Sequence, residues 1–257
     1  EAANILVGGG DNDTLVGNGG DDTFLVSGQY SDHTFNTYDG GAGFDTIRGG
    51  AGDDLIRLRR LDASTRIERI DGGGGFNVLA GTVDNDTLDI RGIELVNIAR
   101  IDGGRGNDTL IGDEAANILV GGGDNDTLVG NGGDDTYVFN RGDGQDTWSD
   151  LDSSVGNQDI ARLGAGISYE QLWLKRSGNH LEASVIGTAD KITVQNWYAG
   201  SANHIERFEA GGKALLDSKV DLLVQAMAAF APPSAGQSTL PDNYRQALAP
   251  VLAANWQ

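Results

Sequence analysis

Residues 103–138 read GGRGNDTLI GDEAANILV GGGDNDTLV GNGGDDTYV, four nonapeptides in direct succession. Each begins with glycine, presents Asp or Asn at its sixth position and carries one large apolar residue at its eighth. A nine-residue period is the period of neither an α-helix nor a simple array of hairpins. The sixth-position residues are Asp108, Asn117, Asp126 and Asp135, and the eighth-position residues are Leu110, Leu119, Leu128 and Tyr137.

The two halves of each nonapeptide predict different backbone conformations. The glycine-rich half predicts a tight turn, because glycine adopts positive φ without a steric penalty. The second half predicts a three-residue strand whose middle side chain alone points inward. Two nonapeptides then form one flattened coil, and stacked coils pile their apolar residues into a thin core. The pattern therefore predicts a parallel β-solenoid with turns along both edges.

The turns carry the ligands that calcium prefers. On each edge, backbone carbonyls and the sixth-position carboxylates of coils two repeats apart converge, and calcium takes about six to eight such hard oxygens. A single Gly-Gly-x-Gly-x-Asp stretch would more often be a plain turn than a metal site. Four copies in strict phase indicate several bound Ca²⁺ ions.

Composition agrees with this class. The chain has 257 residues with 40 glycines, and its 38 acidic against 18 basic residues give a net charge of −20. That charge excludes nucleic acid as an obvious partner. The excess carboxylates repel one another in a compact chain unless cations are bound. There is no cysteine to support a disulfide framework, and no run of about twenty apolar residues predicts a membrane span. We expect a monomer.

A duplication extends the repeats to the start of the chain. Residues 1–23 recur unchanged as residues 114–136, so Asp13 and Asp22 also occupy sixth positions. Glu1 begins inside a nonapeptide, and we expect the repeats to continue before it in a longer parent protein.

A longer period lies between the two copies. Nonapeptide pairs start at Gly8, Gly40, Gly72 and Gly103, so the interval is 31 or 32 residues. The first three pairs are each followed by a segment that lacks the glycine turn. We interpret these segments as shortened coils of the same solenoid. They are Val26 to Asp39, Leu58 to Asp71 and Ile90 to Asp102.

Candidate ligands in the long-period region are less uniform. Asp45, Asp54 and Asp86 hold sixth positions, whereas asparagine holds this position at Asn77 and Asn117, which are weaker candidates. Arginines crowd this region, and arginine beside a cation site usually meets the charge balance itself. A looser repeat at 141–148 adds Asp146. The predicted metal residues are Asp13, Asp22, Asp45, Asp54, Asp86, Asp108, Asp126, Asp135, Asp146 and Asn117, with the turn glycines Gly8, Gly40, Gly49, Gly103, Gly121 and Gly130.

The pattern changes after residue 149. Alternating apolar residues at 172–174, 181–185 and 192–194, followed by Ile205, predict a small antiparallel cap, which covers the open end of the solenoid. Residues 218–230 predict an amphipathic helix with Ser218 as its cap. Residues 242–257 predict a weakly charged, poorly cored tail. We therefore expect a roll at 1–149, a cap at 150–217, and a helix with a terminal signal at 218–257.

The nonapeptides, the GDGQDT stretch at 142–147, the ITVQNWY stretch at 192–198, the helix and the tail together resemble the carboxy-terminal region of RTX (repeats-in-toxin, haemolysin-type) proteins. The resemblance spans nearly the whole chain. It implies an all-β fold, a right-handed parallel β-roll with a small antiparallel cap and a C-terminal helix. It also implies calcium as the cofactor, a type I secretion apparatus as a partner, and secretion to the outside or surface of a Gram-negative bacterium.

Two other function classes, an enzyme and an adhesive module, are alternatives to a calcium-binding secretion module. RTX repeats often follow an enzyme, but the chain contains no Gly-x-Ser-x-Gly and no His-Glu-x-x-His, and His33, His180 and His204 lack a nucleophile pattern. We expect no active site. An adhesive or receptor-binding module would use Trp173, Trp197 and Tyr198, although core packing is the commoner fate of such aromatics.

The acid excess predicts that the chain is largely disordered without calcium and folds when calcium is added, because a thin core does not offset chain entropy until cations neutralise the carboxylates. Far-ultraviolet circular dichroism during a calcium titration measures this transition. Full strand content in the presence of a chelator would contradict the prediction.

Overall fold

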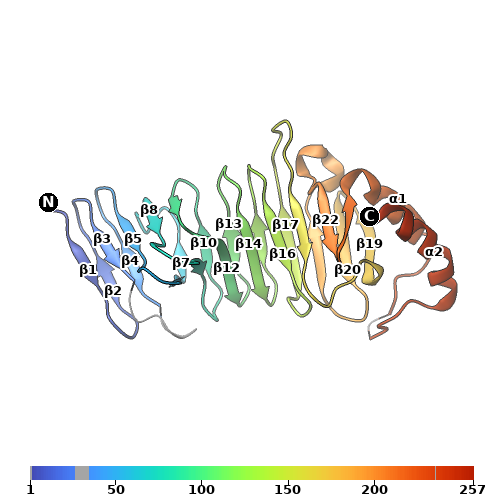
Figure 1. The fold of residues 1–257 in the computed structure, drawn as a ribbon, viewed down its shortest axis with the longest axis horizontal. Helices are drawn as coiled ribbons and strands as arrows, with labels where there is room; N and C mark the ends of the chain where they lie inside the picture. The colour runs from blue at the N-terminus through green and yellow to red at the C-terminus, as the bar shows by residue number, and fades with distance from the viewer. Residues whose placement is uncertain (1, 27–34, 235) are drawn as a thin grey trace.

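The computed structural model describes residues 2–26, 35–234 and 236–257. Short strands stack side by side along one axis, with the N-terminal repeats at one end and both helices at the other (Figure 1). Most strand pairs are parallel. The predicted β-roll is therefore confirmed. His33 and part of the Val26 to Asp39 segment lie outside the described residues.

Two eight-stranded sheets run along most of the described stack. In hydrogen-bonded order, the first consists of β6 (Leu55–Arg57), β9 (Val78–Ala80), β12 (Arg100–Arg105), β14 (Ile118–Gly123), β16 (Thr136–Phe139), β18 (Ile160–Leu163), β22 (Arg207–Ala210) and β23 (Lys213–Leu216). The second consists of β7 (Arg60–Leu61), β10 (Thr87–Asp89), β13 (Thr109–Ile111), β15 (Thr127–Val129), β17 (Gln145–Ser149), β21 (Lys191–Val194), β20 (His180–Val185) and β19 (Leu172–Ser177).

A third face is present only in the N-terminal half. Its five-stranded sheet ends at β11 because the coils that follow contain two strands instead of three. The strands are β1 (Ile5–Val7), β3 (Thr23–Leu25), β5 (Thr46–Arg48), β8 (Arg69–Asp71) and β11 (Glu94–Val96). A separate parallel pair consists of β2 (Thr14–Val16) and β4 (Thr37–Asp39).

The core follows the predicted inward position. Leu110, Leu119, Leu128 and Tyr137 are fully buried, and each is the second residue of its strand. Leu110 pairs with Leu128 and Leu119 pairs with Tyr137, so the eighth positions stack on one another. The predicted two-nonapeptide coil is thus confirmed for residues 109–138, where stacked turns are 18 residues apart.

The predicted 31-residue super-repeat is wrong. Between residues 45 and 77, stacked turns are 23 residues apart, and β5 pairs with β8 in the same register. The segment Leu58 to Asp71 is not a shortened coil. It supplies β7 and β8, with Leu61 and Ile70 fully buried, because it holds two apolar-centred strands that complete a three-sided coil.

The cap continues the sheets of the roll. β21 pairs with β17, and β18 pairs with both β16 and β22, all in parallel. The predicted antiparallel strands then follow: β20 joins β19 to β21, and β23 pairs with β22. Ile205, predicted as a strand residue, is fully buried but precedes β22, which starts at Arg207.

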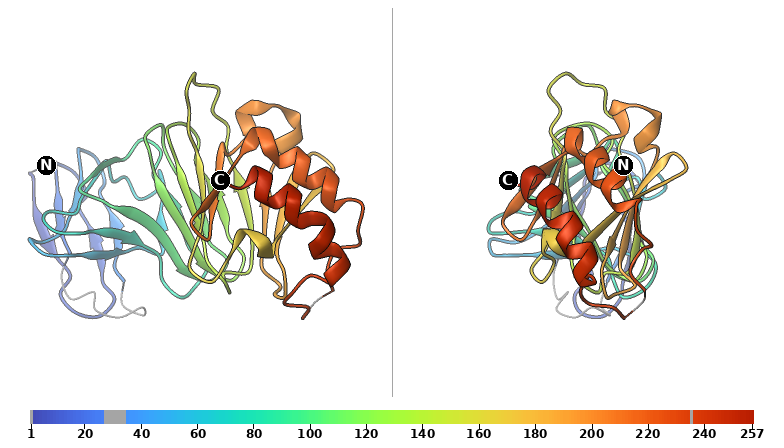
Figure 2. Two further views of the ribbon diagram at one scale, coloured as in Figure 1. Left: turned by 45° about the vertical axis from the view of Figure 1, so that its right-hand side comes forward. Right: turned by 90° about the vertical axis from the view of Figure 1, so that its right-hand side faces the viewer.

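Two α-helices cover the end of the stack (Figure 2). α1 (Asp217–Met227) buries Val220, Leu223 and Met227, as the periodicity predicts, and Leu174 N–H lies 3.1 Å from Met227 Sδ. Its N-cap is Leu216 and not the predicted Ser218. No helix in the described part of the chain is long and apolar enough to cross a membrane. Three short 3₁₀ turns, η1 (Tyr169–Gln171), η2 (Trp197–Ala199) and η3 (Ser201–Asn203), complete the described elements.

The expectation of a poorly cored tail is wrong. Residues 242–255 form α2 (Asp242–Asn255), which buries Leu248 and Leu252. Trp256 is only 1% exposed, and its ring lies 5.7 Å from that of Tyr169. The backbone of Gln257 exchanges two hydrogen bonds with Ala214. Leu248, Leu252 and Trp256 are spaced one helical turn apart, so all three lie on the same face and pack against the cap.

We predict that a chain ending at Ser149 fails to fold at calcium concentrations that fold the whole chain. The cut removes β18 and β21, which pair with β16 and β17 on the cap side, and uncovers Phe139 and Trp148, both fully buried. The terminal coils therefore lose one nearest-neighbour interface. Circular dichroism against calcium concentration measures the effect.

The control is a chain lacking residues 1–23, which shortens the roll at its other end. It should fold near the parent's calcium midpoint. Folding of residues 1–149 at that same midpoint would contradict a nucleating role for the cap.

Candidate metal centre

The sixth-position carboxylates form a row along one edge of the roll. Asp86 N–H donates to Asp108 Oδ1 at 2.8 Å, and Asp108 N–H donates to Asp126 Oδ1 at 2.8 Å. Asp126 N–H then donates to Asp146 Oδ1 at 3.1 Å. The predicted stacking of acidic turns two repeats apart is therefore confirmed for this row.

The same bond recurs in other rows of turns. Asn4 N–H donates to Asp22 Oδ1 at 2.7 Å, and Asp22 N–H donates to Asp45 Oδ1 at 2.8 Å. On the opposite edge, Asn117 N–H donates to Asp135 Oδ1 at 2.7 Å. One carboxylate oxygen of each such aspartate thus links its own coil to the preceding one.

The second oxygen of these carboxylates has no donor. Burying a charged oxygen without a partner is costly, so each of these atoms requires a cation or a proton. The buried Oδ2 atoms that accept no hydrogen bond belong to Asp13, Asp22, Asp45, Asp108, Asp126, Asp135 and Asp146.

The first glycine of each repeat leaves space beside that oxygen. A Cβ built on Gly103 would lie 2.5 Å from Asp108 Oδ2 and 2.5 Å from the carbonyl oxygen of Gly121, which is closer than any side chain tolerates. A Cβ on Gly121 or Gly130 would lie 2.4 Å from Asp126 Oδ2 or 2.3 Å from Asp135 Oδ2. A Cβ is therefore excluded beside each of these carboxylates, and at Gly103 a carbonyl oxygen also faces the carboxylate.

The N-terminal turns repeat this geometry. A Cβ built on Gly8 would lie 2.7 Å from Asp13 Oδ2, and one built on Gly40 would lie 2.5 Å from Asp45 Oδ2. The described residues contain no preformed cluster of three or more His, Cys, Asp or Glu side chains. At Gly40 and Gly103 the oxygens that face the glycine are one carboxylate and one backbone carbonyl, a composition that fits calcium and not a soft metal.

Burial raises the pKa of these carboxyls. The pKa is about 8 for Asp108, Asp135 and Asp146 and about 7 for Asp126, mainly through desolvation, with neighbouring aspartates adding to it. The unfolded chain ionises near a pKa of about 3.9. The cation-free roll therefore loses stability as pH rises from that value through the folded pKa, and a bound cation reverses this loss.

Three predicted residues, Asp54, Asp86 and Asn117, and the weaker candidate Asn77 are satisfied without a cation. Asp86 accepts hydrogen bonds from the backbone and hydroxyl of Thr82, and Asp54 Oδ2 accepts Gly50 N–H at 2.6 Å. A Cβ on Gly49 would lie 2.8 Å from that same oxygen. Asn77 donates to the carbonyl of Asn97, and Asn117 exchanges hydrogen bonds with Asp113. These turns have the weakest structural requirement for calcium.

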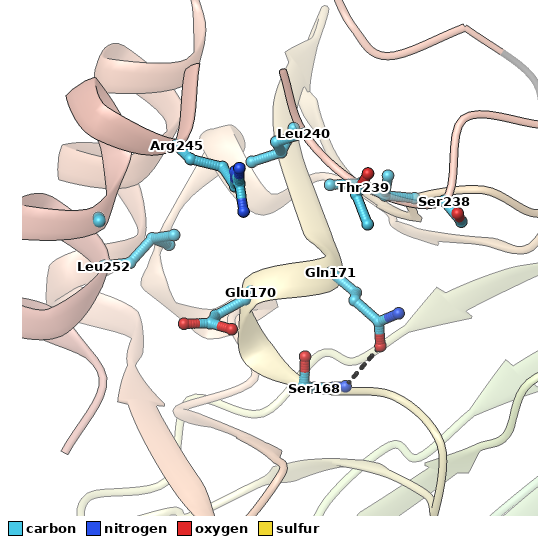
Figure 3. A pocket seen from close by; sticks show the side chains of 10 residues that line it. Ser168, Glu170, Gln171, Ser238, Thr239, Leu240, Arg245 and Leu252 are labelled. Carbon is cyan, nitrogen blue, oxygen red and sulfur yellow. Dashed lines mark hydrogen bonds between the residues drawn. The ribbon is translucent and has the colours of Figure 1, made fainter. Parts of the chain in front are cut away.

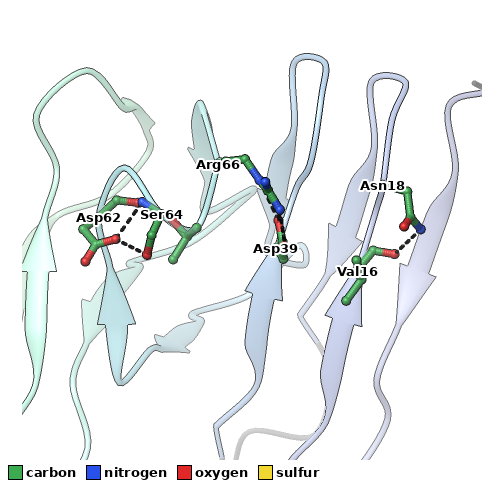
Figure 4. Close-up of polar contacts among 7 residues, drawn as sticks. Val16, Asn18, Asp39, Asp62, Ser64 and Arg66 are labelled. Atoms are coloured by element: carbon green, nitrogen blue, oxygen red, sulfur yellow. Dashed lines mark hydrogen bonds and ion pairs between the residues drawn. The ribbon is translucent and has the colours of Figure 1, made fainter.

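Arginines supply positive charge in the same central region, as the sequence suggests. Arg66 pairs with Asp39 across neighbouring coils, close to a second local cluster in which Asp62 accepts from Ser64 (Figure 4). Arg57 Nη1 donates to the turn carbonyl of Gly81 at 3.0 Å. Guanidinium groups thus engage a carboxylate and a turn carbonyl in this region.

Sequence reasoning missed the acids that continue these rows outside the nonapeptides. Asp45 N–H donates to Glu68 Oε2 at 2.7 Å, Asp135 N–H to Asp159 Oδ1 at 2.8 Å, and Asp159 N–H to Glu206 Oε2 at 2.9 Å. Each of the three acids directly precedes the first residue of a β-strand. The sequence signal that identifies these acids is an Asp or Glu directly before an x-apolar-x strand, without the glycine-rich turn of a nonapeptide.

The described histidines have structural partners. His204 lies 3.1 Å from Asp217 Oδ2 and 3.0 Å from the carbonyl oxygen of Trp197, and it stacks on the Trp197 ring. His180 Nδ1 accepts Asn196 N–H at 3.0 Å. A pocket of about 510 Å³ beside α2 is lined by Glu170, Arg245 and mostly small or apolar residues (Figure 3). It holds no nucleophile and base in contact.

We predict that Asp126→Ala raises the calcium midpoint of folding more than Asp13→Ala does. Asp126 accepts from the coil on one side and donates to the coil on the other, whereas Asp13 lies in the first described coil. The expected difference is roughly three- to tenfold, equivalent to about 0.7–1.4 kcal/mol.

Calcium titrations followed by circular dichroism measure both midpoints. Asp126→Asn is the matched control, because it keeps an acceptor for Asp108 N–H and removes only the charge. Equal midpoints for the two alanine variants would contradict the importance of the stacked row.

Comparison with known proteins agrees with this geometry. The model of the RTX calcium-binding nonapeptide repeat matches residues 1–29, 34–59, 62–89, 100–128 and 111–146. The model of the haemolysin-type calcium-binding protein related domain matches residues 180–210.

Individual relatives match only in part. The iron-regulated protein FrpA of Neisseria meningitidis serogroup C is 36% identical over 86 residues, which are 32% of this chain and 8% of that protein. The extracellular lipase LipA of Serratia marcescens is 20% identical with a TM-score of 0.36, over 74% of this chain and 36% of the lipase. The chain thus spans a small part of these relatives. Because the nonapeptide model covers half of its residues, the chain belongs to the RTX family of calcium-binding repeat proteins.

Proposed function

We propose that this chain is the calcium-responsive folding and export module of a larger secreted protein. The observation that carries the proposal is the set of seven buried, unpartnered carboxylate oxygens in the turns of the roll. At low calcium these charges oppose compaction, and at the higher calcium of the extracellular medium they become ligands. Dissociation constants of about 10⁻⁴–10⁻³ M, typical of extracellular modules, suffice for this switch.

The signal for export lies, in this proposal, in the last segment of the chain. Residues 218–257 contain all of α1 except its first residue, all of α2 and the terminal Trp-Gln, and residues 242–257 carry few charges. In an unfolded chain these residues are accessible, whereas in the folded chain Trp256 and Leu252 are buried against the cap. Recognition by a type I secretion apparatus would therefore precede folding.

We further propose that this chain is not an enzyme. In support, the described histidines are engaged by Asp217, Trp197 and Asn196, and no described pocket joins a nucleophile to a base. Catalysis by the parent protein would reside in residues outside this chain.

The adhesive alternative finds less support. Trp173 and Trp197 are only 4% and 2% exposed, so they are core residues. Tyr198 is half-buried beneath the guanidinium of Arg176, which lies 4.2 Å from its ring centroid. These three aromatics form no exposed contact surface.

We expect that a chain ending at Phe230 is not exported by cells that express a type I secretion apparatus. Immunoblots of medium and cell fractions, with calcium kept low in the cytosol, measure the distribution. Trp256→Ala is the control: it weakens the folded packing of α2 but keeps the segment.

The expected pattern is retention of the truncated chain and export of Trp256→Ala. Export of the truncated chain at the parent's level would disprove the placement of the signal. Equal retention of both variants would show that folding, and not a recognised segment, limits export.

A further inference from the structure

A second group of acids lies where the roll passes into the cap. Asp150 directly follows β17, Asp159 directly precedes β18, and Glu206 directly precedes β22. Asp150 is 1% exposed and Asp159 is fully buried. None of the three belongs to a nonapeptide, since the matched repeats end at residue 146.

Asp150 occupies the register position of a turn glycine. Gly130 N–H donates to the carbonyl oxygen of Ser149 at 3.1 Å, which places Asp150 beside Gly130 in the adjacent coil. Elsewhere in the roll a glycine at this position leaves a gap beside the sixth-position carboxylate. Here a second carboxylate fills that gap, and both of its oxygens are buried without a hydrogen-bond partner.

Asp159 lies between the other two acids. Its Oδ1 accepts Asp135 N–H at 2.8 Å, its Oδ2 accepts Asn157 Nδ2 at 2.5 Å, and its own N–H donates to Glu206 Oε2 at 2.9 Å. The Asn157 Oδ1 and Asp135 Oδ2 atoms are also buried and unpartnered. Hydrogen bonds thus connect the acids Asp135, Asp159 and Glu206 and the amide of Asn157 at this junction.

Nearby basic side chains leave this charge uncompensated. Arg162 and Arg207, on the two strands that Asp159 and Glu206 precede, both pair with Glu209, at 3.4 Å and 2.8 Å. Acids buried in this way require either a shared proton or a cation.

We propose that Asp150, Asp159 and Glu206, together with the amide oxygen of Asn157, bind one Ca²⁺ ion at the junction of roll and cap, in addition to the ions of the nonapeptide turns. An all-oxygen set rich in carboxylates selects a hard divalent cation, and its charge favours affinity. The described His, Cys, Asp and Glu side chains form no group of three that already holds the geometry of a metal site, so the three acids must move closer together when the ion binds. The site does not depend on the export role proposed above.

The site predicts that Asp150→Asn lowers the number of calcium ions bound by the folded full-length chain by one. Asparagine keeps the size of the side chain and removes its charge. Calcium bound after desalting, measured by atomic emission against protein concentration, gives the count. Glu170→Gln is the control, because it removes one exposed acid of the cap and should leave the count unchanged.

Two results would overturn the proposal. An unchanged count in Asp150→Asn, with folding at lower calcium than the parent, would show that Asp150 and Asp159 share a proton, since the new amide would donate to Asp159. Crystals of the unmodified chain grown with Tb³⁺ provide a second measurement that does not depend on the variant folding. An anomalous peak between Asp150, Asp159 and Glu206 is expected, and its absence would exclude the site.

Discussion

The carboxylate at the sixth position of each turn is the interaction on which the structure depends. One oxygen accepts an amide hydrogen bond from the preceding coil, as Asp126 does from Asp108, and so holds adjacent coils together. In seven of these aspartates the other oxygen is buried with no donor. The same side chain therefore joins the coils and places a charge among them that only a cation or a proton neutralises. Folding and calcium binding are coupled through this one group.

The position of this carboxylate also requires glycine in the turns. A Cβ on Gly103 would collide with both Asp108 and the carbonyl of Gly121, so the residue must lack a side chain for oxygen atoms to converge there. Where other groups reach the carboxylate, the requirement changes. Thr82 donates to Asp86, and Arg66 neutralises Asp39. The roll thus contains turns with their own partners and turns that depend on an ion.

The cap is not a separate layer placed on the roll. Both long sheets cross from β16 and β17 into β18 and β21 by parallel pairing before the antiparallel strands begin. The fully buried Trp148, the junction acids and the helices therefore belong to one continuous hydrophobic and hydrogen-bonded unit. In a stacked array each coil is stabilised by its neighbours, so this end provides interfaces that the exposed Ile5 and Val7 at the other end lack.

The sequence by itself determined the strands, the inward residues and the ligand type, because side-chain alternation and glycine turns are local properties. Leu110, Leu128 and Tyr137 were identifiable in this way, as were Asp108 and Asp126. Only the tertiary structure decided which coils are neighbours. The 23-residue register of the central turns, the packing of Trp256, and the difference between the satisfied Asp86 and the unpartnered Asp108 all depend on contacts between residues distant in sequence. A local period does not encode those contacts, because several stacking registers place the same apolar residues inward.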